Sequence, residues 1–114
     1  MMVARARHAT GPFVVRRDRA SGLALPVVAA SARWRAPGHN ATVADARGRL
    51  WLMYHAVDVR RPRAAAADDM NSRRVVVLDR LVFRGGWPAV ARGAPSASER
   101  PAPAISRPAH RNAR

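Results

Sequence analysis

The chain has 114 residues, of which 21 are Arg and none is Lys, and its formal net charge is +14. Apolar residues make up 48% of it, but 25 of them are Ala, and Leu, Ile, Val and Phe together number only 22. So small an aliphatic content limits the chain to one domain with a modest core.

The absence of cysteine excludes disulfides, thiolate zinc sites and cysteine nucleophiles. No apolar run approaches the ~20 residues that cross a bilayer, and residues 1–13 lack the apolar segment of a secretory signal, so neither a membrane nor a compartment is predicted.

The positive charge is spread along the chain. Residues 1–40 carry seven Arg and one Asp, residues 41–91 carry nine Arg and five Asp, and residues 92–114 carry five Arg and one Glu. Nucleic-acid binders usually concentrate their charge on one element, with lysines or with aromatic residues for stacking. Nucleic acid is therefore not the favoured partner. A small basic nucleic-acid-binding or interaction module remains the alternative function.

Runs rich in Val, Leu and aromatic residues, bounded by Gly, Pro, Asn and Asp, predict an all-β fold. The predicted strands cover residues 13–17, 41–45, 50–57 and 75–83. The second and third strands are joined by residues 45–49, in which Gly48 supplies the positive φ that a short hairpin turn needs. We therefore expect these two strands to pair in the antiparallel sense.

The remaining segments are predicted to lack regular structure. Residues 60–72 form a polar connection, and residues 85–88 form a tight turn. From Arg92 onward Pro, Ala, Ser and Arg dominate, with one Ile and no aromatic residue. Such a segment cannot bury enough apolar surface to fold, so residues 92–114 are predicted to be a disordered basic tail.

Several ordered motifs point to one family. Residues 36–43 read APGHNATV, residues 45–58 read DARGRLWLMYHAVD, and residues 73–83 read RRVVVLDRLVF before the turn GWP at 86–88. This order and spacing resembles the last blade of glycoside hydrolase family 43, the five-bladed β-propeller glycosidases. Residues 4–13, which contain ARAR and TGPF, resemble the end of the preceding blade. Short antiparallel strands within about fifty residues also match one propeller blade.

The resemblance implies a division of the chain into three parts. Residues 1–35 would be the end of the penultimate blade and a connection, residues 36–91 the last blade, and residues 92–114 the tail. The expected fold class is therefore all-β, with one antiparallel propeller blade and part of the preceding one. The implied activity is the inverting hydrolysis of arabinofuranosyl or xylosyl bonds in plant polysaccharide. The implied partner is an oligosaccharide that contains arabinose or xylose.

The resemblance assigns no catalytic carboxylate to this chain. Inverting glycosidases need an acid and a base on carboxyl groups about 6.5 to 9.5 Å apart, and in the family these residues precede the matching segment. Glu99 lies in the predicted tail, Asp45 in the hairpin turn, and Asp58 and Asp79 at strand positions that the family motif treats as structural. We therefore expect a carboxyl-terminal fragment of a family 43 enzyme, inactive by itself.

Three residues carry over to the substrate pocket, namely His39, Asn40 and Arg74. His39 matches the family histidine that faces the central channel and binds calcium or water in arabinanases. Calcium prefers 6 to 8 oxygen ligands, so waters would have to complete such a site; no other cofactor is expected. Arg74 matches an arginine that contacts the sugar in members with Trp in place of Phe83. Without the resemblance, His39 would be a hydrogen-bonded structural group and Arg74 a solvated charge at a strand start.

The neighbouring aromatic residues are assigned mainly to packing. Tyr54 and His55 point to opposite faces of their strand, and both are expected to pack or to hydrogen-bond rather than to bind a ligand. Trp51 and Trp87 are expected to fill the blade, whereas for Trp34 packing and sugar stacking both remain open.

Overall fold

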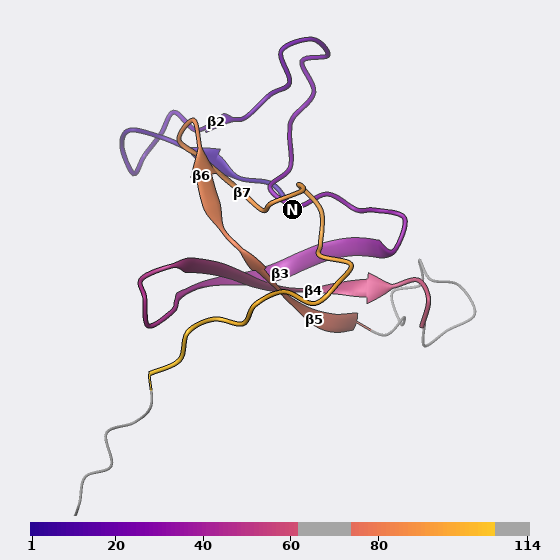
Figure 1. Cartoon of the computed structure of the whole chain (residues 1–114). Coiled ribbons are helices and arrows are strands. Elements are labelled where there is room, and N and C mark those ends of the chain that lie inside the picture. Colours follow the sequence, from indigo (N-terminus) through magenta and orange to yellow (C-terminus); the bar gives the residue numbers. More distant parts are fainter. Residues whose placement is uncertain (62–73, 107–114) are drawn as a thin grey trace, which may run out of the picture.

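The computed structural model describes residues 1–61 and 74–106 of the chain (Figure 1). Within these residues the fold contains strands and no helix, which confirms the predicted all-β class. The strands are β1 (Ala4–Arg5), β2 (Val14–Val15), β3 (Trp34–Ala44), β4 (Leu50–Asp58), β5 (Arg74–Arg80), β6 (Val82–Arg84) and β7 (Trp87–Ala89). They form one three-stranded sheet in the order β3-β4-β5 and two separate pairs, β1-β2 and β6-β7, all antiparallel.

The predicted hairpin joins β3 to β4. Gly48 has a φ of 71°, its amide donates to the carbonyl of Asp45 at 2.8 Å, and Ala44 pairs with Leu50 across the turn. The strand before the turn is longer than expected, because β3 begins at Trp34 and not at residue 41. Residues 36–40 contain Pro and Gly, which favour turns, yet the backbone stays paired with β4 through two bulges.

The predicted strand at residues 75–83 is divided at Leu81. The amide of Leu81 donates to the carbonyl of Leu50 at 3.0 Å, and its side chain is buried in the core, so the chain leaves the central sheet there. β6 then pairs with β7 through a turn at Gly85 and Gly86, both with positive φ. The turn is shorter than the predicted residues 85–88, because Trp87 and Pro88 belong to β7. The predicted first strand is reduced to β2. Most of the predicted connection at residues 60–72 lies outside the described residues.

The core lies on one face of the central sheet. Alternate residues of β4 turn toward it, namely Leu52, Tyr54 and Ala56, and Val77 of β5 joins them. The other buried apolar members are Val27, Val28, Trp34, Leu81 and Val90. The β1-β2 and β6-β7 pairs lie together on one side of this sheet (Figure 1), and Arg5 joins them because its guanidinium donates to the carbonyl of Gly86 at 3.2 Å.

The opposite face of the central sheet is also apolar, and it is exposed except around Trp51, which lies on this face and is buried. Val43, Met53 and Val76 lie on three adjacent strands, and their side chains are 49%, 45% and 73% exposed. Leu78 pairs with Met53 on the same face. A sheet normally buries its apolar side chains against another layer, so this face has the composition of a packing surface.

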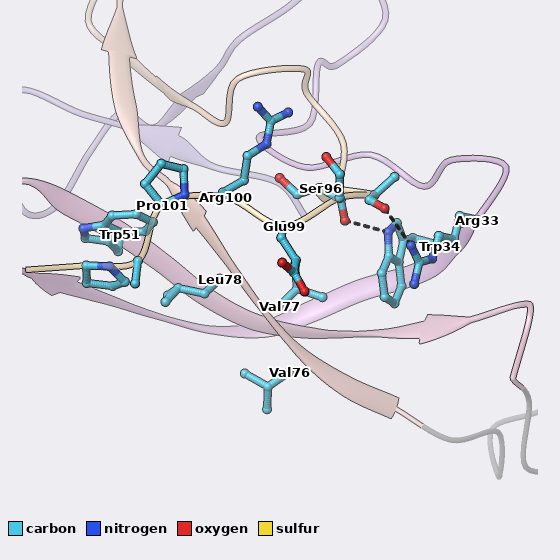
Figure 2. Close-up of a pocket in the computed structure, with 14 residues that line it drawn as sticks. Arg33, Trp34, Trp51, Val76, Val77, Leu78, Ser96, Glu99, Arg100 and Pro101 are labelled. Atoms are coloured by element: carbon cyan, nitrogen blue, oxygen red, sulfur yellow. Dashed lines mark hydrogen bonds between the residues drawn. The ribbon is translucent and has the colours of Figure 1, made fainter.

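The structure corrects the prediction of a disordered tail over residues 92–106. Residues 96–104, called the strap below, run back over the central sheet toward the β3-β4 hairpin (Figure 1). At one end, the amide of Ser96 donates to the buried carboxylate of Asp79 at 3.2 Å, and its hydroxyl also donates to that carboxylate. The indole Nε1–H of Trp34 donates to the carbonyl of Ser96 at 3.0 Å (Figure 2).

The other end of the strap is held at the hairpin. The amide of Ala104 donates to the carboxylate of Asp45 at 3.3 Å, and its carbonyl accepts from the amide of Ala46 at 2.9 Å. Polar anchors therefore fix a segment whose composition offers little apolar surface to bury, which explains why composition alone predicted disorder. Residues 107–114 of the predicted tail lie outside the described residues.

Replacing Tyr54 with Phe should destabilise the fold measurably. The Tyr54 hydroxyl donates to Asp79 at 2.7 Å, and both side chains are buried, so the Tyr54→Phe variant leaves a buried carboxylate short of a donor. We expect a loss of about 1–3 kcal/mol in the free energy of unfolding, measured by urea titration. Ser98→Ala, at an exposed position of the strap, is the control and should change stability by less than about 0.5 kcal/mol. Equal stability of Tyr54→Phe and the unmodified chain would contradict this account.

Candidate functional site

Two bulges distort the middle of β3. Between Arg35 and Gly38, and again between Gly38 and Ala41, β3 uses one more residue than β4 opposite it. Each bulge contains one non-glycine residue in the left-handed region, Ala36 with φ 46° and His39 with φ 53°. Bulges of this kind redirect side chains and often lie at functional sites. The sequence pattern that looked like a turn therefore forms a bent strand that presents His39.

His39 and Arg74, both predicted as pocket residues, meet at this bend. The ring of His39 stacks on the ring of His55, with centroids 5.2 Å apart and planes inclined by 25°. Arg74 donates from Nε to Nδ1 of His55 at 2.6 Å and from Nη2 to the carbonyl of Ala36 at 2.6 Å. The guanidinium thus ties β5 to β3 across β4. We call His39, His55 and Arg74 the imidazole–guanidinium cluster.

Asn40 belongs to the predicted pocket but makes none of these contacts. It follows His39 on β3 and is exposed. The structure places it beside the imidazole–guanidinium cluster, where its amide is open to solvent.

His55 is the member that the sequence interpretation assigned to packing. It is half-buried and lies opposite Gly38 on β3 and Val76 on β5. The sequence did contain a signal for its contact with His39. If β3 and β4 are paired from Ala44–Leu50 without any bulge, residue 39 lies directly opposite residue 55. The expected alternation is confirmed, since Tyr54 enters the core and His55 takes the other face.

The hydrogen bond from Arg74 fixes the protonation of His55. A guanidinium can only donate, so Nδ1 of His55 must accept, and the proton of the neutral ring lies on Nε2. Burial, the charge of Arg74 and the charge of His39 together lower the pKa of His55 below its ordinary value. At neutral pH this cluster therefore offers N–H donors from a neutral imidazole and a permanently charged guanidinium.

The N–H groups of this cluster can donate hydrogen bonds to hydroxyl or carbonyl oxygens of a ligand. The ring of His39, which stacks on His55, can form one wall of the binding site. The cluster contains no carboxyl group, which inverting glycosidases use as acid and as base.

Two described carboxylates near the sheet do not have the properties of a general acid. Hydrogen bonds from Arg33 lower the pKa of Asp58. In Asp45, hydrogen bonds from Arg49, Trp51 and two further backbone amides outweigh burial and lower the pKa. Both shifts are opposite to that of a general acid.

The cluster does not match a calcium site built by this chain. Calcium prefers 6 to 8 oxygen ligands, whereas His39 lies against a second imidazole whose Nδ1 faces a guanidinium. Among residues 1–61 and 74–106, no group of three or more His, Asp or Glu side chains is arranged to hold a metal ion.

The three tryptophans are engaged in the fold. Trp34 and Trp51 are buried, and Trp87 is half-buried beneath the guanidinium of Arg5, whose Cζ lies 4.2 Å from the ring centroid. Packing is thus the role that the structure gives to Trp34, for which sugar stacking was also open.

Comparisons of the chain with protein-family models, with curated proteins and with solved structures found no match. In the described part of the chain, no helix is long and apolar enough to span a membrane.

The pKa of His55 should lie below its ordinary value of about 6.5. Because the folded state favours the neutral ring, the stability that this histidine contributes is complete above about pH 6.5 and is lost as pH falls through the lowered pKa. Histidine NMR signals followed against pH will measure the shift. Arg74→Gln, which removes one of its causes, should move the pKa upward. A pKa for His55 equal to that in the urea-unfolded chain would contradict the described contact.

Ala36→Gly should stabilise the chain by about 0.5–1 kcal/mol. A left-handed conformation costs a non-glycine residue ~1–2 kcal/mol, which the substitution removes. The greater conformational freedom of Gly in the unfolded chain reduces this gain in stability by ~0.5–1 kcal/mol. Ala41→Gly is the matched control, because Ala41 is exposed on the same strand and regularly paired with Met53. The control should lower the free energy of unfolding. Loss of stability in both variants would show that the bend at Ala36 is wrong.

Proposed function

We propose that this chain supplies the carboxyl-terminal blade of a five-bladed propeller glycosidase similar to glycoside hydrolase family 43. In this proposal its imidazole–guanidinium cluster and Asn40 form one wall of a pocket for an arabinofuranosyl or xylosyl group. The observation that carries the proposal is the meeting of His39 and Arg74 through His55. These two residues were assigned to the pocket from separate motifs, and the fold brings them together.

The central sheet supports the proposal in a second way. A propeller blade packs both of its faces on neighbouring blades, so both faces should be apolar. One face of β3-β4-β5 carries the core, and the other exposes Val43, Met53 and Val76. β3, β4 and β5 would then be three strands of the blade, with β3 next to the channel.

The role proposed for the chain is binding, without catalysis. A pentose presents hydroxyl groups that accept from the Nε2–H of His55 and from the guanidinium of Arg74, while the His39 ring offers an apolar wall. Hydrolysis would require carboxylates from other blades, because Asp45 and Asp58 are ionised structural anchors in this chain. Loss of the cluster should therefore weaken productive binding and leave the acid and base in place.

We expect the purified chain to release no sugar from nitrophenyl arabinofuranoside or nitrophenyl xyloside. In NMR titrations, arabinotriose and xylotriose should nevertheless shift the side-chain signals of His39, His55 and Arg74 more than maltotriose does. In a five-bladed enzyme whose last blade is replaced by residues 36–91, His39→Ala should lower kcat/KM at least tenfold, as loss of a substrate-positioning group does.

Arg47→Gln, at an exposed position of the β3-β4 turn, is the control in the same chimera and should leave kcat/KM within twofold. Two results would refute the proposed function: identical shifts with all three sugars, or unchanged kinetics in His39→Ala. Salt-dependent shifts of the same signals by an oligonucleotide, without shifts by the pentoses, would favour the basic binding module instead.

A further inference from the structure

β5 forms one edge of the central sheet, and in the part of the chain that the structure describes only β4 pairs with it. Edge strands present unpaired backbone N–H and C=O groups, which proteins usually protect with Pro, with bulges or with charged residues. The other edge strand, β3, contains both Pro37 and two bulges. β5 pairs regularly from Arg74 to Arg80 and has the uncharged run Val75–Leu78 in its middle. The middle of the β5 edge therefore lacks these protections.

An open groove lies along this edge, between β5 and the strap. It has a volume of about 600 Å³, and residues 76–78 of β5 line it together with Trp34 and most of the strap. The strap does not take the place of a further strand, because no backbone hydrogen bond joins it to β5 among the described residues. Since the strap is fixed at both of its ends, the groove is part of the fold.

The charge directed into the groove is negative, although the whole chain carries +14. Figure 2 shows the side chain of Glu99 pointing from the strap toward β5, whereas that of Arg100 points away from the sheet. Arg33 also lines the groove, but it is paired with Asp58 at 2.9 Å. Within the described residues, the ion pairs do not include Glu99. Its carboxylate is therefore available to a cation that enters the groove.

A second copy of this chain does not suit the edge. When two β5 strands pair in the antiparallel sense about Val77, Arg74 of each copy lies opposite Arg80 of the other. Like charges directly opposite each other destabilise a sheet, and each copy also carries the same large positive charge. The edge therefore favours a strand of different sequence.

From the edge, the groove and Glu99 we infer that β5 and the strap bind an extended segment of another protein, which adds as a strand to β5 and presents a Lys or Arg side chain to Glu99. Strand addition satisfies the edge N–H and C=O groups through main-chain hydrogen bonds, while alternate side chains give specificity.

The two faces of β5 define the sequence that is preferred. Side chains of an added strand alternate between the faces, so the residue opposite Val77 points to the side on which Glu99 lies. Its neighbours point to the face of Val76, which is 73% exposed and lies on the other side of β5 (Figure 2). The preferred segment therefore reads apolar, basic, apolar.

This groove is separate from the imidazole–guanidinium cluster, because His39, His55 and Arg74 do not line it. Binding of a peptide at β5 therefore stands or fails independently of the proposed glycosidase function.

The test is an NMR titration of the whole isotope-labelled chain with the end-blocked peptide Thr-Val-Lys-Val-Thr, and separately with Thr-Val-Glu-Val-Thr. The Lys peptide should shift the backbone amide signals of residues 75–78 and of Glu99 along a saturable curve. The Glu peptide should bind at least fivefold more weakly.

Methylated peptides distinguish strand addition from binding through side chains alone. Two versions of the Lys peptide carry methyl groups on alternate backbone nitrogens. A strand directs alternate N–H groups to opposite sides, so the version methylated on the nitrogens that face β5 should lose at least tenfold in affinity. The other version should stay within threefold of the unmethylated peptide.

A charge reversal locates the basic residue of the peptide. Glu99 is exposed, so Glu99→Lys leaves the core intact, and this variant should bind the Glu peptide more tightly than the Lys peptide. Ala20→Lys adds a positive charge at an exposed turn outside the groove. This control should keep the preference for the Lys peptide.

Any of four results would overturn the inference. The first three are the absence of a saturable shift with the Lys peptide, equal affinities of the two methylated versions, and a Glu99→Lys variant that still prefers the Lys peptide. The fourth is a dimer of the chain alone, seen by sedimentation, in which the amides of residues 75–78 are protected from exchange, because a second copy would then occupy the edge.

Discussion

The carboxylate of Asp45 is the point on which the rest of the fold depends. It accepts from the amides of Arg47 and Arg49 at 2.9 Å each, which shapes the turn between β3 and β4. Its other oxygen accepts from Nε of Arg49 and from the indole of Trp51. A turn sets the register of its hairpin, and a shift of one residue would exchange the two faces of the sheet. Through this turn, Asp45 sets the register from Ala44–Leu50 to Ala41–Met53, and the bulge that follows brings His39 onto His55.

The same carboxylate connects the hairpin to one end of the strap. Asp79 on β5 holds the other end of the strap. The Asp79 carboxylate accepts from the hydroxyl of Tyr54 and from the hydroxyl and the amide of Ser96. For Asp45, hydrogen bonds that favour the ionised form outweigh burial and lower the pKa, which keeps the charge in place in acid. An arginine-rich chain thus uses its few acidic residues as internal anchors. The arginines in turn stack on rings, as Arg5 does on Trp87 and Arg80 on Trp51.

The sequence indicated the all-β class, the Gly48 hairpin and two of the clustered residues, because alternation, turn residues and motifs are local signals. It did not indicate that β3 continues through residues 36–40, because bulges let a strand pass Pro and Gly without losing its partner. It assigned His55 to packing, since only the register across the hairpin shows what lies opposite. It also predicted disorder for the strap, whose order comes from contacts with Asp45 and Asp79 that are remote in sequence.

The position of the strap has a consequence for the order in which the molecule is completed. Asp45 and Ala104 are separated by 59 positions, whereas the turn contacts of Asp45 reach only to position 51. During synthesis the hairpin contacts are available long before residue 104 leaves the ribosome, and contacts between distant positions form late in folding. The nascent chain thus passes through a stage with a formed turn, an uncovered Trp51 and an Asp45 carboxylate still open to water. The groove that the strap forms with β5 is therefore absent until the strap residues have been synthesised.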